Sequence, residues 1–213
     1  MNFSNDRTVI IDYDAGNLRS VQRACAEVGC DALITGDPEV IQHSTRIIFP
    51  GVGAAGAAMR SIQAHGIDEV LLDRYEQGVP ILGICMGLQI SLTHSEEDDQ
   101  ETIGLIEGQV KRFQIKDLSL KVPHMGWNEV TVVRPHPVLA HIHPGDEFYF
   151  VHAYYPHPKD ESCVYGIATY ETPFCCAVGR KNFFGTQFHP EKSGRIGLQL
   201  LASFFKWDGS IAE

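Results

Sequence analysis

The sequence predicts an α/β fold in which a mostly parallel sheet is flanked by helices and carries an antiparallel extension. In the first half of the 213-residue chain, short apolar runs alternate with helical patterns. This alternation implies βαβ units with helices on both faces of a sheet. In the second half, most strand-like runs follow one another without a helix-length segment between them, which indicates antiparallel pairing. The length favours one domain over residues 1–213.

The individual elements follow from apolar spacing and from turn residues. The first half is expected to contain a strand at 8–11, a helix at 18–28 closed by Gly29, strands at 32–34 and 47–49, helices at 54–65 and 68–77, and a strand at 81–84. The second half is expected to contain strands at 109–113, 130–133, 147–151, 164–170 and 175–178, and a final helix at 194–207. Ligands of open α/β sheets bind at the carboxyl ends of the strands. Residues 14–16, residues 50–53 and Cys85 all lie at such ends in this interpretation.

The composition narrows the class of protein. A net charge of −10 argues against nucleic acid or an anionic membrane as a partner. No run of 18 apolar residues occurs and the N-terminus lacks a signal pattern, so we expect a cytoplasmic protein. The six cysteines include no Cys-x-x-Cys pair, and all are expected to be reduced. Adjacent Cys175 and Cys176 should point to opposite faces of a strand.

Cys85 follows the last strand of the first half, within Gly83-Ile-Cys-Met-Gly87. Glycines on both sides of a nucleophile allow a sharp strand-to-helix turn, as in the Gly-x-Ser-x-Gly elbow. A thiol at the start of a helix also gains from the helix dipole, which favours the thiolate. Cys85 is therefore a candidate nucleophile. The alternative is a buried cysteine at the end of a strand.

A second apolar run ends in His189-Pro-Glu191. A catalytic cysteine needs a base within hydrogen-bond reach and a third group that orients this base. His189 can take the thiol proton and Glu191 can hold the ring, although a structural histidine in a strand-ending turn is the alternative. The separation of roughly 100 residues from Cys85 is usual for catalytic partners that meet only in the fold.

Several segments resemble a known family. Gly83-Ile-Cys-Met-Gly-Leu-Gln89 and Gln187-Phe-His-Pro-Glu191 together resemble the triad, or class I, glutamine amidotransferases. The glutaminase subunits of imidazole glycerol phosphate synthase are similar to the chain at Pro50-Gly-Val-Gly53, His124-Met-Gly-Trp-Asn128, Phe150-Val-His152 and Glu191-Lys-Ser193. The resemblance covers nearly the whole chain. It implies the class I amidotransferase fold, a role in histidine biosynthesis and no cofactor.

Acyl transfer needs hydrogen-bond donors where negative charge develops on the substrate oxygen. The N–H of Met86, directly after the nucleophile, is one candidate donor. The glycines of Pro50-Gly-Val-Gly53 could expose further N–H groups, or could form an ordinary strand-to-helix loop. The resemblance implies an oxyanion role for Gly51 and Val52.

Two side chains are candidates for binding the substrate. Gln89 lies one helical turn after Cys85 on the same face, where it could bind the amino-acid head group, cap the helix or face solvent. The acidic run at 95–101 is expected to be mostly a solvated loop. By its position after the elbow, Glu97 matches the residue that pairs with the α-ammonium group of glutamine in the family, and Glu96 is the fallback.

A metal site is not expected. His136, His141 and His143 lie among prolines, but no carboxylate or cysteine completes a credible ligand set beside them. Two further histidines, His124 and His152, belong to the family segments. They are candidates for the ammonia exit or the partner face, and a structural role is the alternative.

The acceptor of ammonia is expected on another chain, because this one has no (β/α)₈ repeat and no obvious phosphate cradle. The resemblance implies a cyclase subunit as the partner in a heterodimer. By the same resemblance, Trp127, Asn128, Tyr149 and Lys192 should lie in or beside the interface. A core tryptophan is the alternative for Trp127.

The sequence thus predicts a glutaminase that passes ammonia to a cyclase, which makes imidazole glycerol phosphate and aminoimidazole carboxamide ribotide. An amidotransferase with a different acceptor is a second possibility, because the triad does not distinguish acceptors. A non-catalytic binding subunit is a third, and the presence of Cys85, His189 and Glu191 argues against it. Ammonia release from glutamine, with and without the partner, distinguishes these possibilities.

Overall fold

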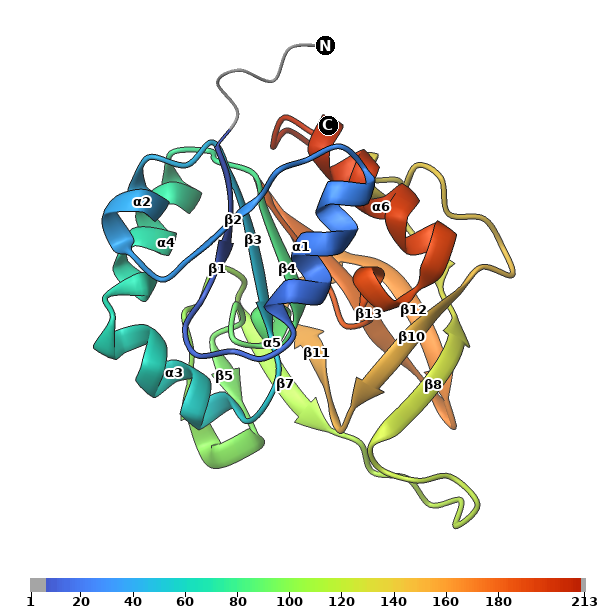
Figure 1. Cartoon of the computed structure of the whole chain (residues 1–213). Coiled ribbons are helices and arrows are strands. Elements are labelled where there is room, and N and C mark those ends of the chain that lie inside the picture. Colours follow the sequence, from blue (N-terminus) through green and yellow to red (C-terminus); the bar gives the residue numbers. More distant parts are fainter. Residues whose placement is uncertain (1–6, 212–213) are drawn as a thin grey trace.

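A twisted eight-stranded sheet runs through the molecule in the computed structural model, which describes residues 7–211 (Figure 1). Its strands, in spatial order, are β2 (Leu33–Thr35), β1 (Thr8–Ile11), β3 (Arg46–Gly51), β4 (Ile81–Cys85), β14 (Phe183–Thr186), β13 (Thr172–Arg180), β12 (Val164–Tyr170) and β9 (Thr131–Val132). Neighbours are parallel from β2 to β14 and antiparallel from β14 to β9. The mostly parallel sheet with an antiparallel extension is confirmed.

Helices cover both faces of the parallel part (Figure 1). One face carries α1 (Leu18–Glu27) and α6 (Gly194–Lys206), and the other carries α2 (Pro38–Gln42), α3 (Ala55–Ala64) and α4 (Ile67–Glu76). Strand β1 is buried along its whole length because its residues alternate between the two cores: Ile10 packs on the α1 side, and Val9 and Ile11 pack on the α3 side. An apolar run without alternation is what such a doubly covered strand requires.

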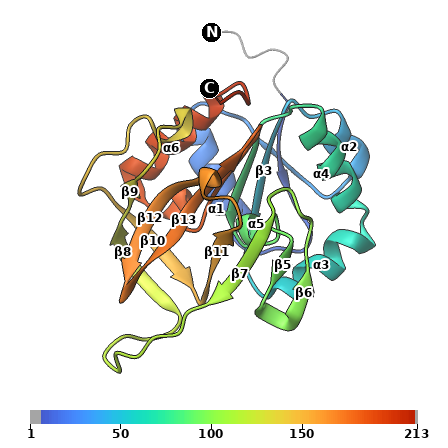
Figure 2. The same cartoon turned by 180° about the vertical axis from the view of Figure 1, so that it is seen from behind.

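Two smaller sheets lie beside the large one (Figure 2). The first pairs β8 (His124–Glu129) with β10 (Glu147–His152), and the second has the order β11 (Tyr154–Pro158), β7 (Gly108–Arg112), β5 (His94–Ser95) and β6 (Gln100–Glu101). The remaining elements are the short helix α5 (Met86–Gln89) and single 3₁₀ turns at Glu97–Asp99, Pro137–Leu139, Glu161–Cys163 and Pro190–Lys192. The junction between β10 and β11 faces the carboxyl end of β4, so the small sheets complete the site that the parallel strands begin.

β8, β11, β5, β6 and the short helix α2 were not predicted from the sequence, and β14 was recognised only as the apolar run before His189. Its expected strands and helices are present, with ends shifted by a few residues. Cys175 packs toward the core beneath α3 and Cys176 toward the core beneath α6, so the two thiols do point to opposite faces. Cys25, Cys85, Cys163, Cys175 and Cys176 are free thiols. None of the helices between residues 7 and 211 has the length and apolar character that a membrane crossing requires.

Candidate active site

Cys85 sits on a sharp turn between β4 and α5, with φ 54° and ψ −107°. A side-chain-bearing residue in this region of backbone space costs about 1–3 kcal/mol, which the surrounding packing must hold. Gly87 permits that packing, because a Cβ there would collide with the carbonyl oxygen of Phe49 in β3. On the other side, a Cβ at Gly83 would lie 2.8 Å from the ring of Phe183. The predicted turn is therefore present: Gly87 lets α5 pack on β3, and Gly83 leaves room on β4 for the Phe183 ring of β14.

The turn after β14 brings a histidine and a carboxylate next to Cys85. His189 is fully buried, and its Nδ1 lies 2.8 Å from Oε1 of Glu191. The other ring nitrogen, Nε2, makes no hydrogen bond of standard geometry. Cys85 lies close enough to His189 to raise its pKa through hydrogen bonding and charge. Catalytic hydrogen bonds are often long in a ligand-free enzyme. The structure therefore brings together the three residues that the sequence analysis grouped.

The charge state of His189 follows from its neighbours. Burial by itself lowers the pKa of His189, because the imidazolium loses hydration. Hydrogen bonding and charge interactions with Cys85 and Glu191 more than offset burial and raise the pKa to about 10. Cys85 and Glu191 therefore favour the charged form of the ring, which is the form His189 takes when it accepts the thiol proton.

The turn that carries His189 is tied to strand β10. The N–H of His189 donates to the carbonyl of Tyr149 (2.9 Å), and the N–H of Tyr149 donates to Oγ of Ser193 (3.0 Å). The Ser193 hydroxyl in turn donates to the carbonyl of His189 (2.6 Å). These three hydrogen bonds form a closed loop, which we call the β10 clamp.

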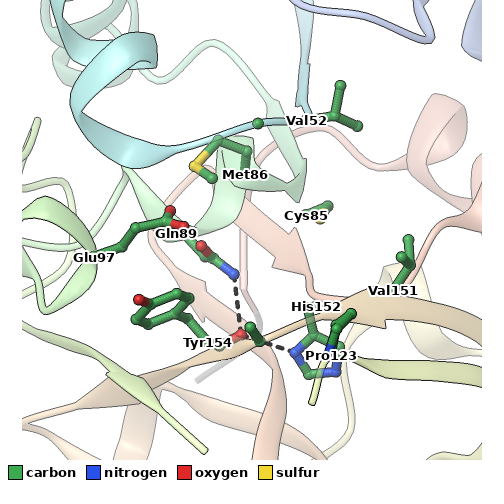
Figure 3. A pocket seen from close by; sticks show the side chains of 11 residues that line it. Val52, Cys85, Met86, Gln89, Glu97, Pro123, Val151, His152 and Tyr154 are labelled. Atoms are coloured by element: carbon green, nitrogen blue, oxygen red, sulfur yellow. Dashed lines mark hydrogen bonds between the residues drawn. The ribbon is translucent and has the colours of Figure 1, made fainter. Parts of the chain in front are cut away.

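The candidate oxyanion donors lie on both sides of the nucleophile. Gly51 ends β3 and is the register partner of Cys85, and Met86 begins α5. Val52 and Met86 line the same cleft as Cys85 (Figure 3). Gly51 itself does not line the cleft. The hydroxyl of buried Tyr13 fills the space that a Cβ at Gly51 would need. Any side chain at position 51 would displace Tyr13.

A cleft of about 300 Å³ opens over Cys85 (Figure 3). Its lining residues are Val52, Gly53, Cys85, Met86, Gln89, Glu97, Pro123, Val151, His152, Ala153 and Tyr154. The cleft thus contains both side chains that were expected to bind the substrate.

The two neighbouring glutamates have different surroundings. Oε2 of Glu97 accepts a hydrogen bond from the N–H of Ala55 at 2.9 Å. Burial raises the pKa of Glu97, and this hydrogen bond offsets part of that effect. Glu96, the fallback, instead accepts from the N–H of Arg112 at 2.8 Å and lines a different hollow. Only Glu97 of the two reaches the cleft over Cys85.

The sequence profile of the family described as "Glutamine amidotransferase class-I" matches residues 9–207. The chain belongs to the class-I glutamine amidotransferases. This amidotransferase is 48% identical over 209 residues to the "Imidazole glycerol phosphate synthase subunit HisH" of Nitratidesulfovibrio vulgaris (strain DP4), with 96% of this chain and 98% of the relative covered. It is 43% identical over 212 residues to the protein of the same name from Chromobacterium violaceum, with 96% of this chain and 100% of the relative covered.

Solved structures support the fold. One described as "Crystal structure of glutamine amidotransferase" superposes with a TM-score of 0.72 at 18% identity, covering 93% of this amidotransferase and 97% of that chain. Another, "Structure of PurLQS from Thermotoga maritima", gives a TM-score of 0.73 at 20% identity, with coverage of 95% and 98%. At these identities the likeness shows the shared fold alone.

Three of the four expected interface residues share one surface of the amidotransferase. Trp127 is 54% exposed and packs edge-on against Tyr149, with ring centroids 6.2 Å apart. Nζ of Lys192 lies 5.8 Å from the centroid of the Tyr149 ring. We call this surface the Trp127 face. The exposure of Trp127 rules out the alternative of a core tryptophan.

Asn128 does not join the Trp127 face. Successive strand residues point to opposite sides, so its side chain turns inward. It donates to the carbonyl of Thr169 at 2.9 Å and lies 3.3 Å from Nε2 of His124.

The histidines have structural surroundings. His136 is buried and stacks on Phe184, and burial lowers its pKa to about 3. His141 and His143 lie on the surface. Across residues 7–211, no group of three His, Cys, Asp or Glu side chains is placed to hold a metal ion.

The sequence analysis missed two side chains that touch the triad. Nδ2 of Asn17, at the start of α1, donates to Oε1 of Glu191 at 2.6 Å. Nε2 of Gln187 lies 3.7 Å from Sγ of Cys85. Gln187 belongs to the quoted Gln-Phe-His-Pro-Glu segment, so its position beside His189 was available as a signal. A lone Asn17 in a loop offered none.

Proposed function

We propose that this amidotransferase is the glutaminase subunit of an imidazole glycerol phosphate synthase. One domain over residues 1–213 would hydrolyse L-glutamine and pass ammonia to a cyclase subunit in a cytoplasmic heterodimer. The observation that carries the proposal is Cys85 on a strained turn at the base of a cleft, with the His189–Glu191 pair beside it. The names of relatives 43–48% identical over nearly the full length support the histidine pathway over other acceptors.

In this proposal, glutamine lies in the cleft with its side-chain amide over Cys85. The Cys85 sulfur attacks the amide carbon after its proton has passed to His189, and N–H groups from the Gly51-Val52 peptide and Met86 hold the developing oxyanion. Glu97 pairs with the α-ammonium group, and Gln89 contacts the amino-acid head. Glu191 keeps the His189 ring aligned and stabilises its charged form.

Collapse of the tetrahedral intermediate breaks the C–N bond. His189 gives its proton to the departing nitrogen, which leaves as ammonia, and a γ-glutamyl thioester remains on Cys85. Water, deprotonated by the same histidine, then hydrolyses the thioester to glutamate and restores the thiol. Ammonia released into bulk water would become ammonium, which is not a nucleophile. The partner subunit therefore needs to cover the exit.

The test is glutamine hydrolysis by the complex, with the Cys85→Ala variant as the control. We expect the variant to lose glutamine-dependent ammonia release completely, because no other group can form the thioester. The same complex should still run the cyclase reaction when ammonium salts are added. Glutaminase activity in Cys85→Ala would refute the nucleophile. Failure of purified chain and cyclase to form imidazole glycerol phosphate from glutamine would refute the pathway.

A further inference from the structure

The backbone carbonyl of Tyr154 is the meeting point of two hydrogen bonds in the cleft wall (Figure 3). Nδ1 of His152 lies 2.8 Å from this oxygen, and Nε2 of Gln89 lies 3.0 Å from it. A carbonyl oxygen can only accept. Both nitrogens must therefore carry the protons in these bonds, which fixes the His152 tautomer and the orientation of the Gln89 amide.

The His152 tautomer determines the hydrogen bonds that lead away from the cleft, through His124 to Asn128. Burial lowers the pKa of His152 to about 3 and that of His124 to about 4, so both rings are neutral at physiological pH. With its proton on Nδ1, His152 accepts at Nε2 from Nδ1 of His124, 3.0 Å away. His124 then accepts at Nε2 from Nδ2 of Asn128 at 3.3 Å. Asn128 uses the same nitrogen to donate to the Thr169 carbonyl, so every role in the row is set.

The orientation of the Gln89 amide determines the hydrogen bonds that lead toward Cys85, through Gln187. Its Nε2 also lies 3.1 Å from Oε1 of Gln187, so Gln187 presents its oxygen to Gln89 and its nitrogen to the other side. There Nε2 of Gln187 donates to Sγ of Cys85 at 3.7 Å. The opposite orientation of Gln187 would set two amide nitrogens against each other and its oxygen against the sulfur. Gln187 is fully buried and held by both contacts.

We propose that Gln187 is a further catalytic residue of this glutaminase, whose amide N–H stabilises the Cys85 sulfur as it becomes negative. The row Asn128, His124 and His152, acting through the Tyr154 carbonyl and Gln89, positions that amide. The inference rests on the proposed function, because it assigns a role in the same thiol chemistry. Proton transfer from Cys85 to His189 leaves a charged sulfur, and a hydrogen bond to a charged acceptor is stronger than one to the neutral thiol. The interaction therefore favours the reactive form.

The same row explains a detail of the cleft. Both Nε2 protons of Gln89 are used in these bonds, and its Oε1 is buried without a hydrogen-bond partner among the described residues. That oxygen is an acceptor, and Gln89 lines the cleft. It can accept a hydrogen bond from a molecule bound in the cleft, such as from the ammonium or amide N–H groups of glutamine. The row thus orients the Gln187 amide toward the Cys85 sulfur and leaves Oε1 of Gln89 as an acceptor for the substrate.

Alkylation of Cys85 by iodoacetamide tests the proposal without the partner or glutamine. Mass spectrometry of the Cys85 peptide follows the reaction at neutral pH in the wild type and in Gln187→Met, which keeps the side-chain length and removes the amide. We expect alkylation to slow roughly tenfold or more, the effect of a hydrogen bond to a charged group. In the complex, kcat for glutamine should fall by a similar factor with little change in KM.

Gln22→Met is the matched control. Nε2 of Gln22, in α1, donates to the Ala32 carbonyl, so the same chemical change is made at a residue that does not line the cleft. This variant should alkylate at the wild-type rate. A folded Gln187→Met protein that alkylates at the wild-type rate would overturn the inference.

A second pair of variants covers the case in which Gln187→Met does not fold. His152→Asn keeps an N–H near the position of Nδ1, and His152→Leu removes it. We expect slower alkylation in the leucine variant alone, and equal rates in the two would overturn the positioning row. The Cys85→Ala control keeps the two proposals separate: glutamine hydrolysis by that variant refutes the proposed function, whereas unchanged alkylation in Gln187→Met refutes only this inference.

Discussion

Asn17 and Glu191 are joined by a hydrogen bond of 2.6 Å although they lie 174 positions apart in the sequence. The same oxygen, Oε1 of Glu191, accepts from Nδ1 of His189. Two donors on one oxygen fix the rotation of the carboxylate. Asn17 therefore extends the Cys85, His189 and Glu191 group by one member, from the first βα loop of the chain.

Removing the Asn17 amide should reduce catalysis without unfolding the protein. Asn17 has φ 73°, so Asn17→Gly deletes the side chain at a position where glycine is free of strain. Loss of a hydrogen bond to a charged group predicts a decrease in kcat of roughly tenfold, because His189 is held less well. Asp14→Gly is the control, since Asp14 has φ 66° in the same loop and lies on the surface. Equal kcat values for all three proteins would contradict the role of Asn17.

Glu97→Gln should weaken glutamine binding. The variant keeps the shape of the side chain but cannot pair with the α-ammonium group, so we expect KM to rise roughly tenfold or more with kcat little changed. Glu96→Gln is a matched control one residue away. A larger effect of Glu96→Gln on KM would transfer the role to the fallback residue.

The pH dependence of KM should also report Glu97. Only the ionised carboxylate pairs with ammonium, and burial raises the pKa of Glu97 above its ordinary 4.5. KM should therefore rise as the pH falls, beginning at a higher pH than an exposed glutamate would require. In Glu97→Gln this rise should be absent. An identical acid limb in the two proteins would assign it to another group.

The His189 ring should stay protonated far above its ordinary range. Its pKa is raised from 6.5 to about 10, so its stabilising contribution is complete below pH 6.5 and is lost as the pH rises through about 10. Nitrogen-15 NMR of the ring measures the titration directly. In Cys85→Ala the sulfur is gone, so the His189 pKa should fall. A ring that titrates near 6.5 in the wild type would disprove the charge arrangement.

Trp127→Ala should weaken association with the cyclase and leave the melting temperature of the isolated chain unchanged. Burying an aromatic anchor contributes about 2 kcal/mol or more, which predicts a loss of affinity of roughly 30-fold. Leu33→Ala is the control, because Leu33 is 55% exposed on β2, at the opposite end of the large sheet from β9. Unchanged affinity together with a lower melting temperature would assign Trp127 a role in the fold.

Apolar pattern predicted the strands that are covered on both faces. β1, β3 and β4 are buried throughout, and each contains an uninterrupted apolar run, at residues 9–11, 47–49 and 81–85. β8 lacked this signal because Gly126 and Asn128, both poor strand formers, interrupt it. β11 contains Pro156 and Pro158, which argue against a strand in sequence, but it is an edge strand of its sheet, where proline is tolerated.

The site residues, too, were predicted where a local motif marks them and missed where a contact depends on packing between distant elements. Cys85, His189 and Glu191 were predicted because each lies in a short motif whose chemistry needs that spacing. The contact of Asn17 with Glu191 depends on α1 and α6 packing on the same face of the sheet, which no local pattern encodes. The inward turn of Asn128 depends on the pairing of β8 with β10, and β8 was not predicted.

The β10 clamp makes the Trp127 face and the catalytic base parts of one mechanical unit. Tyr149 contributes its ring to that face and both of its backbone polar groups to the turn that holds His189. A displacement of β10 at the surface is therefore transmitted to the backbone of His189 directly through the Tyr149 carbonyl and indirectly through the Ser193 hydroxyl. A small molecule wedged beside Tyr149 would misalign the base while the glutamine cleft stayed empty. Inhibition of this kind would not compete with glutamine, because the wedge and the substrate would occupy different places.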